Sequence, residues 1–174
     1  MTGRRENTSR RSQRVPAISE NLGPASRWRP SVPLLAAGGV SVVVGGLIAA
    51  VTGPTGWEQG SWVAAFVVLV AGVAQVGLGV GQAQFTAASR SVGFAAAECV
   101  LWNAGCLLVV TGTLLSSPVV VSVGAAPLVA VLAMSTVAVR GRARQSRLAL
   151  AYRALLIVLL VSVPVGIALA WARS

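Results

Sequence analysis

Three polar side chains that could do chemistry lie inside long apolar runs of the sequence. Gln75 lies in the run 61–81, and Glu98 and Asn103 lie in the run 95–115. Such runs have the length of a transmembrane helix, and polar groups inside a membrane are rare because hydrocarbon offers them no hydrogen-bond partner. These residues are therefore the first candidates for a functional site.

The two amides are expected to lie at similar depth. Gln75 is six residues from one end of its run, and Asn103 is eight residues from the matching end of the next run. If the two runs form antiparallel neighbouring helices, a hydrogen bond between Gln75 and Asn103 satisfies both amides. The alternative interpretation is a polar patch that lines the path of a solute.

Glu98 is the one carboxylate near membrane depth, about one turn inside the start of its run. It is close enough to the surface for its side chain to reach the headgroup region. Arg153 has a similar depth in the run 148–171, so we predict an ion pair that holds the third and fifth helices together. The alternative is that Glu98 couples transport to a proton or cation, as membrane carboxylates do in small proton-coupled exporters.

The remaining inventory argues against catalysis. The chain has no His, Lys or Asp, which excludes Ser-His-Asp and metal-assisted schemes. Cys99 and Cys106, the two cysteines, are seven residues apart, or about 10 Å along one helix, too far for a disulfide. We interpret them as small packing residues. The sequence predicts no catalytic, cofactor or metal site and no enzymatic activity.

The composition is that of a membrane protein. Of 174 residues, 55% are hydrophobic and 10% are charged, with a mean hydropathy of +0.78. Soluble domains are about a quarter charged. The apolar residues form five runs, at 34–52, 61–81, 95–115, 118–139 and 148–171. We predict an all-α integral membrane bundle of five transmembrane helices over residues 31–174, preceded by a disordered Arg-rich tail over residues 1–30.

The arginines predict the orientation of this bundle. All fourteen basic residues are Arg, with seven in the first 29 positions and four in 140–147. Basic segments stay on the cytoplasmic side, so the N-terminus is predicted inside and the C-terminus outside. Trp57, Trp62 and Trp171 then lie at the outer interface. We interpret the basic segments as topology signals that contact anionic lipid headgroups, and we expect no nucleic-acid partner.

Several small or polar residues recur at helical spacing and so share a helix face. On the second run such a face comprises Gly72, Gln75, Gly79 and Gln82. The third run has two such faces: one comprises Cys99, Asn103 and Cys106, and the other comprises Glu98, Trp102, Gly105 and Gly112. On the first run the stripe is Ala37, Ser41, Gly45 and Ala49. Small side chains allow helix backbones to approach closely, so the stripe on the first run and the glycines of the second run are candidate packing surfaces.

Three stretches, FVVLVAGVAQVGLGVGQA, LWNAGCLLVVTGTL and YRALLIVLLVSVPVGIALA, resemble small actinobacterial polytopic membrane proteins of uncharacterised function. The resemblance implies a multi-pass protein of the bacterial inner membrane and no activity. The first functional hypothesis is therefore a non-enzymatic accessory or scaffold component that packs with itself or with a larger membrane complex. The alternative is a small oligomeric transporter or channel for a small solute or protons.

Overall fold

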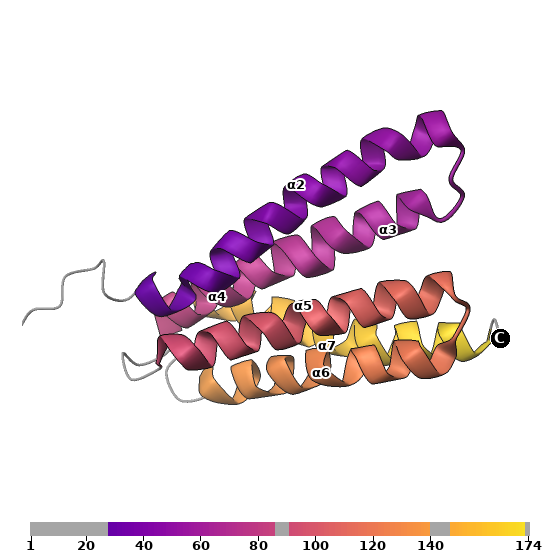
Figure 1. The fold of residues 1–174 in the computed structure, drawn as a ribbon. Coiled ribbons are helices and arrows are strands. Elements are labelled where there is room, and N and C mark those ends of the chain that lie inside the picture. The colour runs from indigo at the N-terminus through magenta and orange to yellow at the C-terminus, as the bar shows by residue number, and fades with distance from the viewer. Residues whose placement is uncertain (1–27, 86–90, 140–146, 173–174) are drawn as a thin grey trace, which may run out of the picture.

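The computed structural model describes residues 28–85, 91–139 and 147–172, and within these ranges every regular element is a helix (Figure 1). Five helices are long and apolar enough to cross a membrane. They are Arg29–Thr55, Gly60–Gln84, Val92–Leu114, Pro118–Val137 and Ala149–Ala172. Each overlaps one of the predicted runs, so the all-α class and the number of spans are confirmed.

The predicted disordered tail lies mostly outside the described residues, which begin at Trp28. Its last residues are helical, since Arg29–Ser31 form the short 3₁₀ helix η1 that leads into the first span. The membrane orientation of the termini stays a prediction.

The first two spans differ in their regularity. The first continues from η1 as α2 (Val32–Thr55), and it ends at Gly56, whose φ of 63° is the left-handed conformation that glycine adopts without a Cβ clash. The second is a continuous rod of three segments: α3 (Gly60–Phe66), the π-helix η2 (Val67–Ala74) and α4 (Gln75–Phe85). The wider π segment therefore lies in the middle of the second span.

The other spans are α5 (Val92–Leu114), α6 (Pro118–Val139) and α7 (Arg147–Ala172). The hydroxyl of Ser91 caps α5 by accepting a hydrogen bond from the Phe94 N–H at 3.2 Å. Proline at the first position of α6 is favourable because it has no N–H to leave unpaired. The turn at Gly56–Gln59 and the turn at Leu115–Ser117 lie at the same end of the bundle, which we call the turn end (Figure 1).

Glycine contacts hold the first hairpin, α2 with α3, η2 and α4, together. A Cβ added to Gly38 would lie 3.0 Å from the carbonyl oxygen of Gly72, and one added to Gly45 would lie 3.0 Å from the amide nitrogen of Val68. The two backbones therefore lie so close together that there is little room for a side chain at either glycine. Of the stripe predicted on the first run only Gly45 is buried, and the packed face is instead Leu34, Gly38 and Gly45.

The second hairpin, α5 with α6, is built in the same way. A Cβ on Gly105 would lie 2.8 Å from the carbonyl oxygen of Gly124, and a Cβ on Gly112 would lie 2.6 Å from the amide nitrogen of Val121. Gly105 and Gly112 belong to one of the two faces predicted for the third run, and the whole of that face is buried. Helical spacing thus grouped these residues on one face, and their burial against α6 is what the structure adds.

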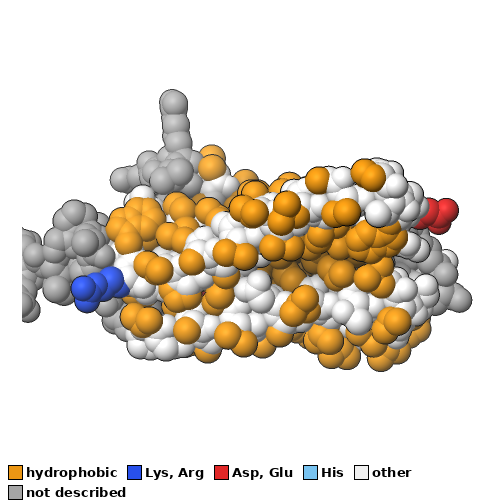
Figure 2. Space-filling view, turned by 45° about the horizontal axis from the view of Figure 1, so that its top comes forward, with side chains coloured by type: hydrophobic (Ala, Val, Ile, Leu, Met, Phe, Trp, Pro, Cys, Tyr) orange, Lys and Arg blue, Asp and Glu red, His pale blue; other side chains and the backbone are white. Residues whose placement is uncertain are grey.

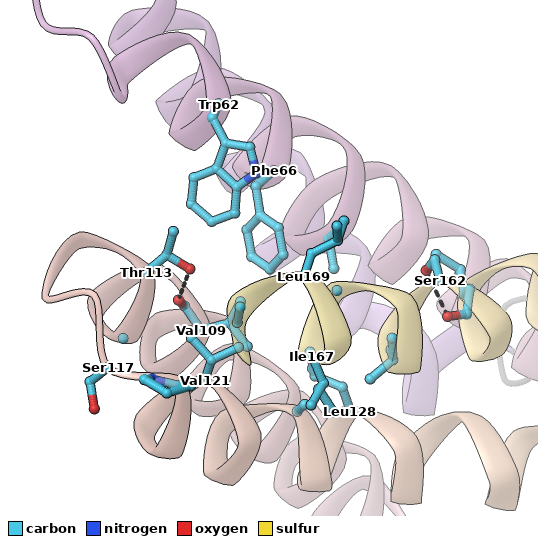
Figure 3. Close-up of a pocket in the computed structure, with 18 of the residues that line it drawn as sticks. Trp62, Phe66, Val109, Thr113, Ser117, Val121, Leu128, Ser162, Ile167 and Leu169 are labelled. Atoms are coloured by element: carbon cyan, nitrogen blue, oxygen red, sulfur yellow. Dashed lines mark hydrogen bonds between the residues drawn. The ribbon is translucent and has the colours of Figure 1, made fainter. Parts of the chain in front are cut away.

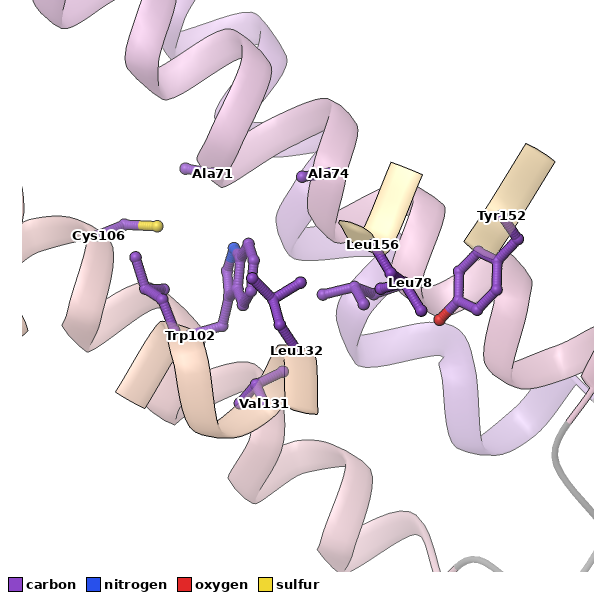
Figure 4. Packing of buried hydrophobic residues seen from close by; sticks show 10 residues of the cluster. Ala71, Ala74, Leu78, Trp102, Cys106, Val131, Leu132, Tyr152 and Leu156 are labelled. Carbon is purple, nitrogen blue, oxygen red and sulfur yellow. The ribbon is translucent and has the colours of Figure 1, made fainter. Parts of the chain in front are cut away.

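The two hairpins meet around a shared core and diverge toward the turn end (Figure 1). Trp102 of α5, 1% exposed, lies at the centre of this core, with Leu78, Leu132 and Leu156 contributed by α4, α6 and α7 (Figure 4). Helix α7 packs against α6 and α4, but only 6% of the residues in its most apolar 18-residue stretch are buried within the bundle. Most of the surface of α7 therefore faces outward.

The outer surface agrees with a membrane setting. In the view of Figure 2 the charged side chains of the described residues lie at the two ends of the bundle, with basic side chains at one end and acidic side chains at the other. Apolar side chains cover the length between them. The surface is what a hydrocarbon layer requires of a bundle that crosses it.

Candidate functional site

A buried carboxylate joins the two hairpins. Glu98 of α5 is only 6% exposed. Its Oε2 accepts a hydrogen bond of 2.7 Å from Nε2 of Gln82 on α4, and its Oε1 accepts one of 3.5 Å from the hydroxyl of Ser135 on α6. Two other helices thus supply hydrogen-bond donors to the carboxylate of α5, which gives partners to a group that hydrocarbon could not satisfy.

The Glu98 side chain points in a different direction from the one that the sequence predicted. The sequence placed this side chain near the surface, within reach of the headgroups, whereas the structure turns it inward between α4, α5 and α6. Arg153 is exposed on α7. The Glu98–Arg153 ion pair stays a prediction, and the Gln82 and Ser135 contacts are the ones that the structure adds.

The second polar cluster is centred on Cys99, which the sequence had suggested only as a packing residue. The Gln75 Nε2 donates to the Cys99 sulfur at 3.2 Å, and Asn103 Nδ2 lies 3.6 Å from the same atom. Asn103 also donates to the Cys99 carbonyl at 2.8 Å, and the Cys99 thiol lies 3.5 Å from the Pro33 carbonyl oxygen. The two amides therefore meet at one sulfur instead of bonding directly to each other.

One atom of this cluster has no partner. Gln75 is completely buried, and its Oε1 accepts no hydrogen bond. Exchanging the amide oxygen and nitrogen would only leave the nitrogen without a partner, because Cys99 contacts one end of the side chain. The cluster is therefore under-satisfied, in contrast to the carboxylate cluster seven residues away along α4.

Trp102 links the π-helical segment to the second hairpin. Its indole N–H donates to the carbonyl oxygen of Val70 in η2 at 3.2 Å. A π-helix changes the direction of its carbonyl groups relative to an α-helix, and such segments are frequent at functional sites. Sequence periodicity placed Trp102 on the same face as Glu98, but it carried no signal for a backbone partner.

Above Trp102 the diverging hairpins leave a groove of about 560 Å³ that extends to the turn end. Trp62 and Phe66 project into it from α3 and are stacked, with ring centroids 5.4 Å apart (Figure 3). Thr113, Val121 and Ile167 come from the opposite side, on α5, α6 and α7 (Figure 3). The groove is hollowed into the apolar face seen in Figure 2.

The groove is chemically simple. Its lining side chains are apolar or uncharged, with the polar ones mainly near the turn end at Gln59, Thr113, Ser116 and Ser117. Among the described residues, no group of three His, Cys, Asp or Glu side chains comes together that could hold a metal ion. The lining suits contact with an apolar group.

The fold and these sites define the class as a multi-pass helical membrane protein with a buried carboxylate beneath an apolar groove. No family model, no curated protein and no solved structure matches the chain.

Proposed function

We propose that the protein is a small, non-enzymatic membrane carrier in which Glu98 takes up and releases a proton as an apolar solute moves. The observation that supports this proposal is the position of the carboxylate at the contact between the two hairpins. Gln82 belongs to the first hairpin, whereas Glu98 and Ser135 belong to the second. Of the two functional hypotheses from the sequence, this geometry favours transport.

The hydrogen bonds give a physical link between protonation and movement. An ionised carboxylate only accepts hydrogen bonds, so it holds the Gln82 amide and the Ser135 hydroxyl together. Protonation turns one oxygen into a donor and weakens its charge-assisted bond to Gln82. This loosens one polar contact between the hairpins, and the groove at their diverging end changes its width.

The groove lies close enough to the carboxylate for this coupling. Trp102 forms the deep part of the groove and lies four residues beyond Glu98, about 6 Å along α5. Leu132, also in the lining, lies three residues before Ser135 on α6. Trp102 and Leu132 are each only 1% exposed, so a change at Glu98 would reach a solute in the groove through the packing of these two side chains.

Proton movement in reconstituted vesicles tests the proposal. Vesicles that contain a pH-sensitive dye are given a pH gradient, and proton release is followed with and without a panel of alkyl amphiphiles. We expect solute-dependent proton movement that is lost in Glu98→Gln. Glu58→Gln is the matched control, because Glu58 is exposed in the turn between α2 and α3. Equal movement in Glu98→Gln and the parent protein, or none in the parent protein, would reject the carrier function.

A second candidate function is that of an accessory subunit, and the exposure of α7 favours it. With only 6% of the residues in its most apolar 18-residue stretch buried, α7 leaves most of its surface to lipid or to another subunit. Pull-down from mild detergent followed by mass spectrometry separates the two functions. A defined heteromer that forms equally well with Glu98→Gln would support the accessory role, and recovery of the chain alone would argue against it.

The cellular setting that we propose follows from the sequence. We place the protein in the bacterial inner membrane, with the basic segments on the cytoplasmic side near anionic lipids. In this orientation the turn end, and with it the groove, faces the outer side.

A further inference from the structure

The two oxygens of the Glu98 carboxylate contact donors of different kinds. Oε2 accepts from Nε2 of Gln82 at 2.7 Å, and Oε1 accepts from the Ser135 hydroxyl at 3.5 Å. The short bond joins α4 to α5 and so connects the two hairpins, whereas the long contact joins α6 to α5 within the second hairpin. The ionised carboxylate thus has its shorter hydrogen bond with the first hairpin.

Only one of these two donors can become an acceptor without moving a heavy atom. An amide N–H can only donate, so Nε2 of Gln82 offers no acceptor to a protonated oxygen. A serine hydroxyl both donates and accepts, and it reverses its role by turning its hydrogen about the Cβ–Oγ bond. Gln82 could accept only if its whole amide group turned over, and its side chain is 8% exposed. Protonation of the oxygen that faces Ser135 is therefore the less costly of the two.

The elements around Glu98 contain few titratable groups. Helices α2, α4 and α6 and the π-helix η2 contain no Asp, Glu, Arg, Cys or Tyr, and the chain has no Lys or His. Arg29 of η1 and Arg153 of α7 are exposed, and the Tyr152 ring of α7 lies against Gly81 of α4. On α5 itself the neighbouring titratable residue is Cys99. Among these elements, Gln82 and Ser135 are the groups whose contacts distinguish the two oxygens.

We infer that protonated Glu98 carries its proton on Oε1 and donates it to the Ser135 hydroxyl, so that its stronger hydrogen bond passes from the first hairpin to the second. A hydronium ion of the aqueous phase supplies the proton, one O–H bond forms, and a water molecule is left. The inference rests on the proposed carrier function and deepens it by naming the residue that the proton engages.

The exchange of partners follows from ordinary hydrogen-bond strengths. The separation between Oε1 and the Ser135 oxygen should shorten from 3.5 Å to about 2.7 Å, the usual length of an O–H···O bond. Oε2 becomes a neutral carbonyl oxygen, so its bond to Gln82 loses the assistance of the charge and becomes longer. Protonation therefore strengthens a contact between α5 and α6 while it weakens the contact between α4 and α5.

Two adjacent hydroxyls on α6 provide a test variant and its control. Ser135 is 2% exposed and contacts Glu98, whereas the Thr136 hydroxyl donates to the Leu132 carbonyl of its own helix at 2.8 Å. Ser135→Ala removes the acceptor that the inference requires. Thr136→Val removes a hydroxyl from the next position of the same helix and leaves the Glu98 contacts in place.

Infrared spectroscopy can identify the protonated oxygen, because a carbonyl that accepts a hydrogen bond stretches at lower frequency than one that does not. The full-length protein in lipid nanodiscs is measured at neutral and acidic pH, and the C=O band of protonated Glu98 is assigned by its loss in Glu98→Gln. With the proton on Oε1, the carbonyl oxygen is Oε2, so Gln82→Leu raises the frequency clearly and Ser135→Ala changes it little. With the proton on Oε2 and the Gln82 amide turned over, these two effects are reversed.

We expect the shift in Gln82→Leu to be at least about twice the shift in Ser135→Ala, with Thr136→Val equal to the parent protein. Equal shifts, the reverse order, or the lack of a Glu98 band at acidic pH would overturn the inference. If Gln82→Leu does not fold, Ser135→Ala decides alone. A clearly raised C=O frequency there would identify Oε1 as the carbonyl oxygen and reject the inference, and a nearly unchanged one would support it.

Proton movement in the vesicles described above gives a second readout. Ser135→Ala should slow solute-dependent movement about fivefold, the effect of losing about one hydrogen bond, and Thr136→Val should match the parent protein. Equal rates in Ser135→Ala and the parent protein would overturn the role of Ser135. The infrared order does not depend on transport. A proton located on Oε1 in a protein that moves no protons would therefore retain this inference and reject the carrier.

Discussion

Gln82 donates a 2.7 Å hydrogen bond to Glu98, and this bond connects the first helical hairpin to the second inside the membrane-spanning bundle. Glu98 is 6% exposed and Gln82 is 8% exposed, so water cannot readily replace either partner. Loss of a charge-assisted hydrogen bond at such a site leaves a buried carboxylate poorly satisfied. The contact therefore has consequences for stability as well as for transport.

The first prediction concerns this contact directly. Gln82→Leu should destabilise the bundle by about 1–3 kcal/mol, because it removes a donor from the buried Glu98 carboxylate. The measurement is reversible unfolding in mixed micelles, followed by circular dichroism. Gln84→Leu is the control, since Gln84 is exposed on the same helix. Equal effects of the two substitutions would show that the bond contributes no stability.

The second prediction contrasts two buried glutamines. Gln75→Leu should change the free energy of unfolding much less than Gln82→Leu, and can even stabilise the bundle. The Oε1 of Gln75 is already unpartnered, so the substitution removes an unsatisfied polar atom together with one contact to sulfur. The two variants are compared under identical unfolding conditions. A larger loss for Gln75→Leu would mean that its amide has a partner in the folded protein.

The third prediction concerns the close packing of α5 and α6. Gly105→Ala should destabilise the second hairpin by about 1–3 kcal/mol, because its Cβ would lie 2.8 Å from the backbone oxygen of Gly124. Gly93→Ala on the same helix meets nothing within 4 Å and should have little effect. Thermal unfolding of both variants in one detergent provides the comparison. If Gly105→Ala unfolds at the parent temperature, the helices are not packed as closely as described.

The fourth prediction concerns the link between α5 and the π-helical segment. Trp102→Phe should cost about 0.5–1.5 kcal/mol beyond the loss of packing, because the Val70 carbonyl loses the indole N–H. Hydrogen exchange of the η2 amides should also increase, since this bond holds the segment against the second hairpin. Trp57→Phe serves as the control because Trp57 is exposed in a turn. Unchanged exchange in Trp102→Phe would contradict the role of the indole.

Much of the architecture could be predicted because hydrocarbon imposes strict requirements on a helix. A span must be about 20 apolar residues long, and this length is visible in the sequence without knowledge of any contact. It was also predictable that Gln75 shares a helix face with Gln82, and Glu98 with Trp102, because each pair recurs at helical spacing. Periodicity reports which residues share a face, and both of these faces are buried.

The site was less predictable because periodicity does not say which faces meet. Sequence reasoning assigned Gln75 and Asn103 to each other, but the structure places Cys99 between them as the common contact. It paired Glu98 with an arginine and did not propose Gln82 or Ser135 as partners. For Gln82, the available signal in the sequence was the face that it shares with Gln75. For Ser135, the available signal was its polar character near the end of a span.

The sequence by itself determined that the chain forms five helices long and apolar enough to cross a membrane, because the required length and composition follow from the thickness and dryness of the bilayer. The tertiary structure alone decided that Glu98 turns inward, that a π-helical turn presents the Val70 carbonyl to Trp102, and that the hairpins diverge to form a groove. These features depend on the relative rotation and tilt of helices. Rotation and tilt are set by contacts between residues far apart in the chain, such as Gly38 with Gly72 and Gly105 with Gly124.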